Sequence, residues 1–594
     1  MTLFQTGKFI KISRNRLLLL LLNMMLFNAP GYAQGTWTPL SSSAPDYNQG
    51  VMILLSDGSV LAKTSGGSDD VYGWRWDKLV PDIHGSYVNG TWYVINPMSY
   101  SRLYFSSQLL KDGTLYVAGG EYGHGRAQAE RYNPITDEWT MLPALTIAAD
   151  TFSDANSEIL PDGRVLQAVV SNHGFATNHV VIFNPATNTY NAAPPTLGIA
   201  NESVWIKLPD NSILFVDINS MHSERYIPSL NIWKRDADLP VALYDIYGSE
   251  TGAAFMLPNG KAFFIGSTST TAYYTPSGDT SNGTWTAGPV IPDSLGAPDA
   301  AAAMMVDGKI LCALSPTPVL DTVFASPTVY YEFDYLTDSF TRVVQIPYIV
   351  GDSSINMPAY MTNMLCLPDG NVLYASQGSD QYYIYTPAGA PLAAGKPTVN
   401  ELIKLECDTF LVTGTLFNGI SEGASYGDDW QMNSNYPIVR LTRNDSVYYC
   451  ATYNWTSTGL MRGSALDSTQ LVIPSTVPGG TYALQLVANG NASDPVSINI
   501  CPTQGVRNVG AAHSITVFPN PANDIVTLGF NTRSSGAYTV KLIDIYGRTA
   551  RSQDAVAVIG DNTCPFPLNG IPKGVYTINI RNADGVYTTK LLVD

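Results

Sequence analysis

The stretch TNMLCLPDGNVLYAS (residues 362–376) consists of an apolar run, a tight polar turn and a second apolar run. Asp369 and Gly370 lie at the centre of the turn, and both residue types tolerate the positive φ angles of a two-residue hairpin turn. The run MLCL directly before the turn is apolar throughout, as in a strand that is buried on both faces. The stretch therefore predicts a buried β-hairpin.

This pattern occurs seven times along the chain. The predicted hairpins span residues 51–64, 106–120, 156–170, 203–217, 253–267, 301–315 and 362–376. Their turn residues, six aspartates and one asparagine, follow one another at steps of 48 to 62 residues. In four repeats the hairpin is followed by two aromatic residues seven positions apart: Tyr132 and Trp139, Phe183 and Tyr190, Tyr226 and Trp233, and Phe333 and Phe340. A period of this length predicts an array of equivalent four-stranded units.

These repeats resemble the kelch repeat, in which about 50 residues form one four-stranded blade. The double glycine that is usual in kelch blades occurs at Gly119–Gly120. The resemblance implies a seven-bladed kelch-like propeller over residues 34–391. The seventh unit lacks an outer strand, and Gly35–Leu40 resembles the outer strand of the second unit. We therefore expect this N-terminal stretch to complete the last blade and to remove an open sheet edge.

Two further domains are expected after the propeller. Residues 396–502 show alternating strand patterns, and their length suits an immunoglobulin-like sandwich. After a linker at 503–514, residues 515–594 contain FPNPANDIVTLGF, VKLIDIYGR, GIPKGVYTINI and KLLVD in this order, and resemble the C-terminal sorting domain of the type IX secretion system. That resemblance implies a source in the Bacteroidota and an interaction with the type IX secretion machinery. The predicted fold class is all-β: a seven-bladed kelch-type propeller, an Ig-like sandwich and a small C-terminal β-sandwich.

Residues 1–33 predict a signal peptide. Lys8, Lys11, Arg14 and Arg16 form a basic region, and Arg16 opens the apolar run RLLLLLLNMMLF; Gly31 and Ala33 offer small residues for cleavage. A membrane anchor is the alternative interpretation, but the apolar run is short for a membrane span. With the sorting-domain resemblance, we expect export across both membranes, to the medium or the outer cell surface. The net charge of −17 disfavours nucleic acid and anionic lipid as partners.

The six cysteines of an exported chain can form disulfides. Cys407 and Cys501 flank the predicted sandwich and are the candidate pair. Cys312 and Cys366 lie inside apolar runs, where a cysteine is more often a small buried hydrophobe.

A propeller followed by an Ig-like "early set" domain resembles galactose oxidase and its relatives. That resemblance implies a copper site with two tyrosines and two histidines, one tyrosine being covalently linked to a cysteine. Tyr360 and Tyr104 match the two tyrosines, while Met361 stands where a histidine is expected and Val51 where the cysteine is expected.

The second histidine of that family comes from the early-set domain, near residues 450–455 of this chain. No histidine occurs between His222 and His513. Thioether sulfur suits copper(I) and does not replace two imidazoles on copper(II). We therefore do not expect copper radical catalysis, and no resident cofactor is predicted.

Acidic residues recur near the start of the inner strands of four successive repeats: Asp154, Glu202, Glu250 and Asp299. With Tyr104 and Tyr360, they form a candidate ligand-binding rim at the mouth of the propeller. Clustered carboxylates could bind a hard cation such as Ca²⁺, a cationic peptide or the hydroxyl groups of a sugar, on whose rings tyrosines stack. A purely structural alternative is that the acids only accept hydrogen bonds from neighbouring backbone amides.

The leading hypothesis is a secreted, non-catalytic module that binds a carbohydrate or protein ligand at the propeller mouth. The alternative is an enzyme on the same frame, either an atypical copper oxidase or a carboxylate-based glycan hydrolase. A third possibility is a scaffold without a small-molecule site.

Overall fold

The computed structural model describes most of the chain after residue 33. The described residues are 34–47, 49–64, 73–145, 150–152, 155–172, 175–343, 354–406, 408–423, 425–426, 434–501, 516–532, 535–544, 548–582 and 585–594. The predicted signal peptide and the predicted linker lie outside them. The chain divides into two compact units, Met1–Ile500 and Cys501–Asp594. No described helix is long and apolar enough to span a membrane.

The protein is all-β, as predicted, and its described residues 34–386 form seven antiparallel sheets of at least four strands, one for each predicted hairpin, and one two-stranded sheet. The first sheet contains β2 (Gln49–Leu54), β3 (Val60–Thr64), β4 (Trp76–Val80) and β5 (Thr91–Val94). The second contains β7 (Ser106–Leu109), β8 (Leu115–Ala118), β10 (Ala129–Asn133) and β11 (Glu138–Met141). The third contains β12 (Asp150–Thr151), β13 (Ser157–Ile159), β14 (Val165–Asn172), β15 (Phe175–Asn184) and β16 (Thr189–Ala193).

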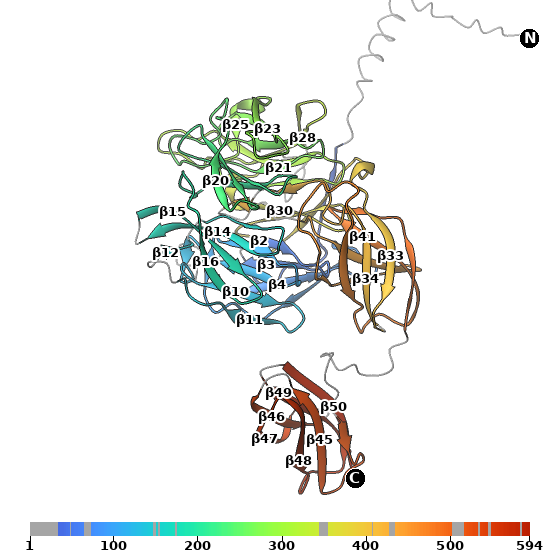
Figure 1. The fold of residues 1–594 in the computed structure, drawn as a ribbon. Helices are drawn as coiled ribbons and strands as arrows, with labels where there is room; N and C mark the ends of the chain where they lie inside the picture. The colour runs from blue at the N-terminus through green and yellow to red at the C-terminus, as the bar shows by residue number, and fades with distance from the viewer. Residues whose placement is uncertain are drawn as a thin grey trace, which may run out of the picture. The chain divides into compact units, whose positions relative to one another are not determined.

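The remaining four sheets follow in chain order (Figure 1). The fourth contains β17 (Val204–Lys207), β18 (Ile213–Val216), β19 (Ser223–Ile227) and β20 (Ile232–Arg235). The fifth contains β21 (Ala254–Met256), β22 (Ala262–Ile265), β23 (Thr271–Thr275) and β24 (Thr284–Ala287). The sixth contains β25 (Leu295–Gly296), β26 (Ala302–Met304), β27 (Ile310–Pro316), β28 (Val329–Asp334) and β29 (Ser339–Arg342). The seventh contains β1 (Thr36–Pro39), β30 (Thr362–Cys366), β31 (Val372–Ser376) and β32 (Tyr383–Thr386).

Short elements connect these sheets. They are β6 (Arg102–Leu103), which pairs with β9 (Tyr122–Gly123), and the 3₁₀ turns η1 (Pro292–Ser294), η2 (Ala359–Met361) and η3 (Ala393–Gly395).

The N-terminal strand closes the ring of sheets. β1 pairs antiparallel with β32, placing Trp37 opposite Tyr385. The last sheet also contacts the first, because β30 packs against β2. Glu332 of the sixth sheet accepts hydrogen bonds from the backbone NH of Gly35 (3.2 Å) and the hydroxyl of Tyr385 (2.5 Å). The expected role of Gly35–Leu40 as the missing outer strand is therefore seen in the structure.

The four aromatic pairs that mark the repeats are cross-strand neighbours. Tyr132 lies opposite Trp139, and their ring centroids are 4.9 Å apart. The other three pairs have the same register, with centroid distances of 4.7 to 5.3 Å. Such pairs stabilise the outer strand of a sheet beyond the area that they bury.

The hairpin turns share one local design. The side chain of each turn residue accepts a hydrogen bond from the backbone NH two positions later, as from Asp57 to Ser59 (2.9 Å) and from Asp369 to Asn371 (3.1 Å). Positive φ falls on the following residue, as at Gly58 (75°) and Gly370 (87°). The expected two-residue turn with two positive φ angles is therefore wrong. The turn is a longer one that ends in a left-handed residue, and the aspartate is selected for its side-chain hydrogen bond.

The described residues between 398 and 500 form a sandwich of two sheets. One sheet contains β33 (Thr398–Lys404), β34 (Thr409–Thr415), β39 (Thr452–Tyr453) and β40 (Asp467–Val472). The other contains β37 (Ile438–Arg443), β38 (Ser446–Cys450), β41 (Gly480–Ala488), β42 (Asn491–Ala492) and β43 (Val496–Ile500). In the chain, β35 (Glu422–Gly423) and β36 (Ser425–Tyr426) lie between β34 and β37. They do not pair within the sandwich: β35 joins the fifth propeller sheet and β36 joins the fourth.

The second unit is a separate small sandwich. Its sheets contain β44 (Thr516–Phe518), β45 (Ile525–Thr532) and β48 (Gly560–Pro567), and β46 (Gly536–Ile543), β47 (Thr549–Ala557), β49 (Gly574–Asn582) and β50 (Gly585–Val593). Alternate residues such as Val540, Leu542, Ile578 and Ile580 are buried between the two sheets, giving this unit its own apolar core.

Candidate functional site

The hairpin-turn end of the propeller is covered by the larger sandwich. Ser56 Oγ donates a hydrogen bond of 2.9 Å to the carbonyl of Thr452, and Thr458 Oγ1 donates one of 3.0 Å to the carbonyl of Leu160. Both propeller residues lie at hairpin turns. The inner strands start at the other end of the ring, which we call the mouth. A ligand site on the propeller is therefore expected at the mouth.

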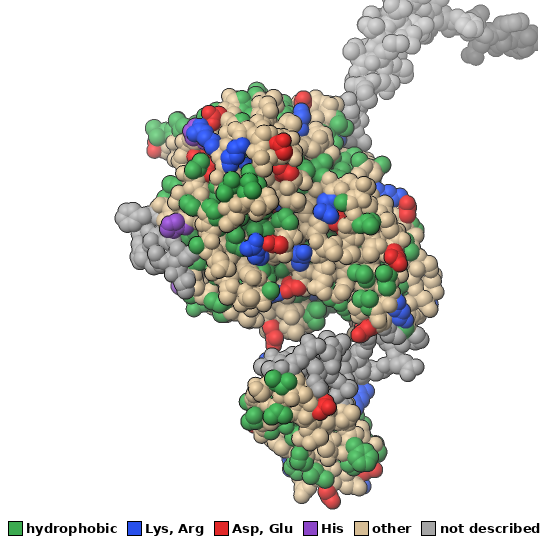
Figure 2. Space-filling view, in the orientation of Figure 1, with side chains coloured by type: hydrophobic (Ala, Val, Ile, Leu, Met, Phe, Trp, Pro, Cys, Tyr) green, Lys and Arg blue, Asp and Glu red, His purple; other side chains and the backbone are tan. Residues whose placement is uncertain are grey.

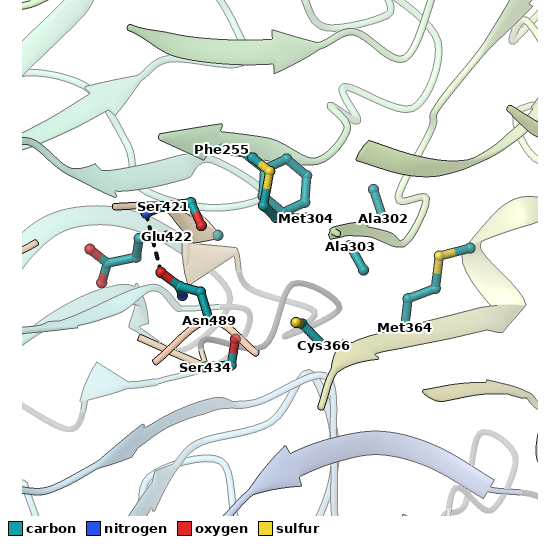
Figure 3. A pocket seen from close by; sticks show the side chains of 11 residues that line it. Phe255, Ala302, Ala303, Met304, Met364, Cys366, Ser421, Glu422, Ser434 and Asn489 are labelled. Atoms are coloured by element: carbon teal, nitrogen blue, oxygen red, sulfur yellow. Dashed lines mark hydrogen bonds between the residues drawn. The ribbon is translucent and has the colours of Figure 1, made fainter. Parts of the chain in front are cut away.

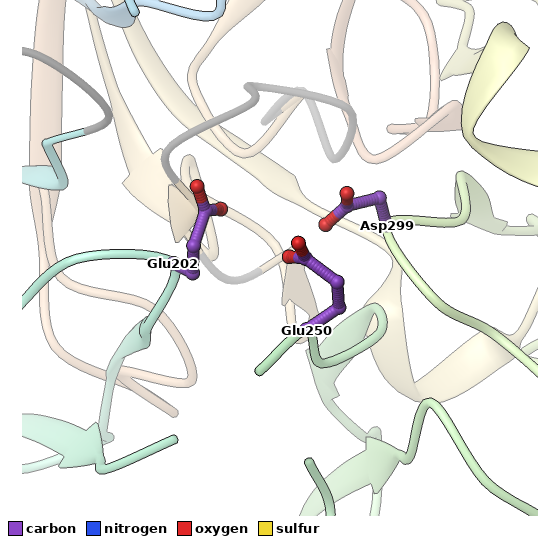
Figure 4. A group of neighbouring side chains, drawn as sticks. All are labelled: Glu202, Glu250 and Asp299. Atoms are coloured by element: carbon purple, nitrogen blue, oxygen red, sulfur yellow. The ribbon is translucent and has the colours of Figure 1, made fainter. Parts of the chain in front are cut away.

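Three carboxylates from neighbouring sheets converge at the mouth. Glu202, Glu250 and Asp299 lie in the loops before β17, β21 and β26, and one carboxylate oxygen from each lies within 4.8 Å of the other two. Figure 4 shows the three side chains pointing toward one another from separate loops. Asp299 is buried, and the two glutamates are half-buried. The structure thus brings together three of the four predicted acids, while Asp154 lies outside the described residues.

Two of the three acids, together with Tyr104, have a left-handed backbone conformation. Tyr104, Glu202 and Asp299 occupy the same position of their repeats, eight residues before the turn residue, and have φ angles of 55°, 50° and 49°. Non-glycine residues rarely adopt this left-handed conformation, and where they do the site is often functional.

Buried hydrogen bonds hold the loops that carry the acids. The backbone NH of Asp299 donates to the carbonyl of Thr251 (2.9 Å). The buried carboxylate of Asp245 accepts hydrogen bonds from the backbone NH groups of Tyr247 (2.7 Å), Gly248 (2.6 Å) and Glu250 (3.1 Å). The acids are therefore presented by fixed loops.

Glu121 is a fourth acid at the mouth that the repeat comparison missed. Burial and the charge of Glu202 raise the pKa of Glu121 to about 7, although a hydrogen bond with Tyr122 and the charge of Arg126 lower it. Glu121 directly follows Gly119 and Gly120, whose φ angles are 80° and 129°. A Cβ on Gly119 would lie 2.3 Å from the carbonyl oxygen of Phe152. The kelch double glycine therefore permits the close approach to the backbone of Phe152 that positions Glu121. In the sequence, an acidic residue directly after this double glycine was the signal that could have identified Glu121.

The two predicted tyrosines complete the rim. The Tyr104 and Tyr122 rings meet edge to face at 6.0 Å, and Gln377 Nε2 donates a 3.5 Å hydrogen bond to the Tyr104 hydroxyl. The backbone NH of Gln377 donates to the carbonyl of Met361 (2.8 Å), which follows Tyr360. Gln377 therefore links the loops of the two tyrosines.

Tyr360 lies beside the carboxylate cluster. Burial and the charge of Asp299 raise the pKa of its phenol. Its ring packs against Phe324 at a centroid distance of 4.8 Å. The mouth therefore combines carboxylates with aromatic rings.

The donor set at the mouth does not fit a galactose-oxidase-type copper centre. The groups beside Tyr360 and Tyr104 are carboxylates, a carboxamide and the thioether residue Met361, whereas copper(II) in that family needs imidazole. Val51 is buried in β2 at the position expected for the cross-linking cysteine. Cys450 is buried, and the stretch 450–455 contains no histidine.

Three of the described histidines have partners away from the mouth acids. His84 Nδ1 lies 2.7 Å from the carbonyl of Asp445, His124 Nδ1 lies 3.0 Å from Ser101 Oγ, and His222 pairs with Asp238 at 3.0 Å. Among the described residues, the carboxylate trio is the one group of three His, Cys, Asp or Glu side chains close enough to hold a metal ion.

The structure describes one of the two cysteines of the predicted disulfide. Cys501 is disulfide-bonded, and Cys312, Cys366, Cys450 and Cys564 are free and buried. Cys407 lies outside the described residues, so the pairing stays a prediction.

The visible surface matches the composition of the chain. On the face drawn in Figure 2, the described Lys and Arg side chains are scattered among neutral and acidic ones and are not gathered in one basic patch.

Comparisons with known proteins identify two segments. Residues 516–594 match the secretion system C-terminal sorting domain, and residues 111–146 match the kelch motif. No curated protein matches the chain. A solved structure of a fungal alcohol oxidase of the AA5 family in complex with copper is similar at 14% identity and a TM-score of 0.48, over 79% of this chain and 100% of that chain. The chain therefore carries kelch-type repeats and ends in a sorting domain of the type IX secretion system.

Proposed function

We propose that this exported kelch protein is a non-catalytic recognition module that binds a carbohydrate at the mouth of the propeller. The observation that carries the proposal is the convergence of Glu202, Glu250 and Asp299, with one carboxylate oxygen from each within 4.8 Å of the other two. Carboxylates accept paired hydrogen bonds from sugar hydroxyls, and the rings of Tyr104 and Tyr360 offer faces on which a sugar can stack. The sorting domain supports a role outside the cell.

A Ca²⁺ ion could take part in this recognition. Carboxylate oxygens are the ligands that Ca²⁺ prefers, and a bound cation could share its coordination with sugar hydroxyls. The three acids offer the required ligand type. Binding assays with added Ca²⁺ and with EDTA separate direct from Ca²⁺-dependent recognition.

A glycan array probed with the full mature protein tests the proposal. The triple variant Glu202→Gln, Glu250→Gln and Asp299→Asn keeps side-chain size and removes the charges. We expect it to fold and to lose the glycans that the wild type binds.

A second triple variant serves as the control: Glu138→Gln, Glu401→Gln and Asp494→Asn change exposed acids elsewhere on the propeller and the sandwich. It should bind as the wild type does. The proposal is wrong if the wild type binds no glycan, or if the mouth variant keeps the full binding profile.

Glycan hydrolysis is the second candidate function, and Glu121 is the observation that favours it. A carboxyl group with a pKa of about 7 next to a second carboxylate is the arrangement of a general acid and its partner. Release of reducing ends from bound glycans, lost in a Glu121→Gln variant, would favour the hydrolase over the recognition module.

A further inference from the structure

A segment of the sandwich domain enters the propeller. β35 pairs antiparallel with the inner strand β21, placing Gly423 opposite Phe255. β36 pairs with the inner strand β17, placing Tyr426 opposite Val204. Val204 follows Glu202 by two residues, so the segment extends along the inner strands toward the mouth. Through β35 and β36 the sandwich domain is thereby connected with two inner strands of the propeller.

A buried cluster of three charged residues lies beside this segment. Lys207 Nζ lies 3.0 Å from Glu158 Oε1 and 2.9 Å from Glu422 Oε1. The three side chains are at most 1% exposed. Glu158 comes from β13 of the third sheet, Lys207 from β17 of the fourth, and Glu422 from the inserted β35. The cluster joins two propeller sheets to the sandwich domain.

One ammonium group cannot neutralise two carboxylates. An unbalanced buried charge costs several kcal/mol, so the cluster favours uptake of one proton. Burial and the charge of Glu158 raise the pKa of Glu422 to about 8, although Lys207 lowers it. Burial alone would lower the pKa of Lys207, but the two carboxylates raise it, so the ammonium stays charged. Below about pH 8 the cluster is therefore neutral, with its extra proton on Glu422.

Two described neighbours of this segment, Asn435 and Cys366, carry no charge in this pH range. Asn435 donates a hydrogen bond to the carboxylate of Glu422. Residues on both sides of the segment line a small cavity, and Figure 3 shows the Glu422 side chain pointing away from Met364 and Cys366 of β30. Burial raises the pKa of Cys366 to about 12, so it remains a neutral thiol.

We propose that the Glu158–Lys207–Glu422 cluster is a protonation-dependent latch that holds β35 and β36 against the inner strands β21 and β17 of the propeller. Opening of the segment exposes Glu422 to water, where its ordinary pKa of 4.5 applies. The opening equilibrium is therefore constant below about pH 4.5, rises up to tenfold per pH unit between there and about pH 8, and is constant again above. Opening becomes more favourable as pH rises because the closed state binds one proton more than the open state.

Hydrogen exchange with mass spectrometry tests the latch in the full mature protein. Protection of peptides covering residues 420–426 is measured from pH 5.5 to 7.5 and corrected for the pH dependence of intrinsic exchange. In the wild type we expect protection to fall up to tenfold per pH unit, that is up to about 100-fold over this range. Glu422→Gln mimics the protonated acid, and its corrected protection should not change with pH.

Two further variants keep the test decisive. Glu401→Gln changes an exposed glutamate of the same sandwich and should retain the wild-type slope. Glu158→Gln leaves one carboxylate for one ammonium and should also flatten the slope, which serves if Glu422→Gln does not fold. A flat wild-type profile overturns the proposal, as does an unchanged slope in both cluster variants.

Discussion

Glu121 and Glu202 reach the mouth of the propeller from loops of two different sheets, and the charge of Glu202 adds to burial in raising the pKa of Glu121 to about 7. The two carboxyl groups are thus coupled, and one of them titrates near neutral pH.

The first prediction concerns this pair. Because Glu202 contributes to the shift, Glu202→Gln should lower the pKa of Glu121 toward its ordinary value of 4.5. A raised carboxyl pKa stabilises the fold fully below about pH 4.5, and that contribution is lost as pH rises to about 7. Carboxyl ¹³C chemical shifts across pH 4 to 9 measure the pKa of Glu121 in the wild type and in the Glu202→Gln variant. An unchanged titration in the Glu202→Gln variant would show that burial acts alone.

The second prediction concerns closure of the ring. The Trp37 ring packs against Tyr385, Tyr374 and Tyr330 at centroid distances of 4.6, 5.3 and 5.6 Å. Trp37→Ala should lower the free energy of unfolding by about 2–3 kcal/mol, less than for a fully buried tryptophan because Trp37 is half-buried. Thr38→Ala, at an exposed position of the same strand, is the control. Equal denaturation midpoints for the two variants would contradict this role.

The third prediction separates strain from contact at the hairpin turns. Gly58 and Gly278 have φ angles of 75° and 79°. A Cβ on Gly58 would lie 2.6 Å from the Tyr449 ring of the sandwich domain, whereas a Cβ on Gly278 meets nothing within 4 Å. Gly278→Ala should therefore cost about 1 kcal/mol from backbone strain alone, and Gly58→Ala about 1–3 kcal/mol more. Thermal unfolding compares them, and similar losses would mean that the sandwich yields at Tyr449.

The fourth prediction concerns copper. Because Met361 stands where one imidazole is needed and residues 450–455 contain no histidine, incubation with Cu²⁺ followed by dialysis should leave well below one copper per chain. Met361→His restores one imidazole only and should not change this outcome. Elemental analysis and the visible spectrum measure it. Stoichiometric copper together with a radical absorption band would refute the donor-set reasoning.

The fifth prediction concerns the cysteines. Since Cys501 is disulfide-bonded and four other cysteines are free, alkylation of the unfolded, unreduced protein should label four of the six cysteines. Labelling after reduction should reach all six. Peptide mapping should identify Cys407 as the partner of Cys501, and a linked pair without Cys407 would disprove the predicted bridge.

Much of the fold was predictable because its signals are local. The side chain of Asp369 and the left-handed Gly370 define a turn within a few residues, and the same turn recurs along the chain. Pairing partners within one repeat are close in sequence, and Tyr132 and Trp139, seven positions apart, lie opposite each other on adjacent strands. The turn type itself was predicted wrongly, because an Asp-Gly pair suits two hairpin geometries that differ only in backbone angles.

The candidate site was only partly predictable. Glu202, Glu250 and Asp299 could be placed on one rim because equivalent positions of a ring of repeats face the same end. Glu121 was missed because it lies in a loop after the inner hairpin, outside the position that was compared. The inserted Glu422 was missed because its partners, Glu158 and Lys207, lie more than 200 residues earlier in the chain.

The sequence by itself determined the repeat, the order of the sheets and the sorting domain, since each depends on patterns within a few tens of residues. The closing N-terminal strand was predictable because its sequence resembles the outer strand of another repeat, although it pairs with a strand at the other end of the propeller sequence. Only the tertiary structure decided which carboxylates meet at the mouth, which of their backbone positions are left-handed, and how Lys207 comes to lie between two buried acids. The physical reason is that charge and burial act through space. Their effect on a pKa depends on distances that loop conformation and domain insertion set, and no local pattern encodes those distances.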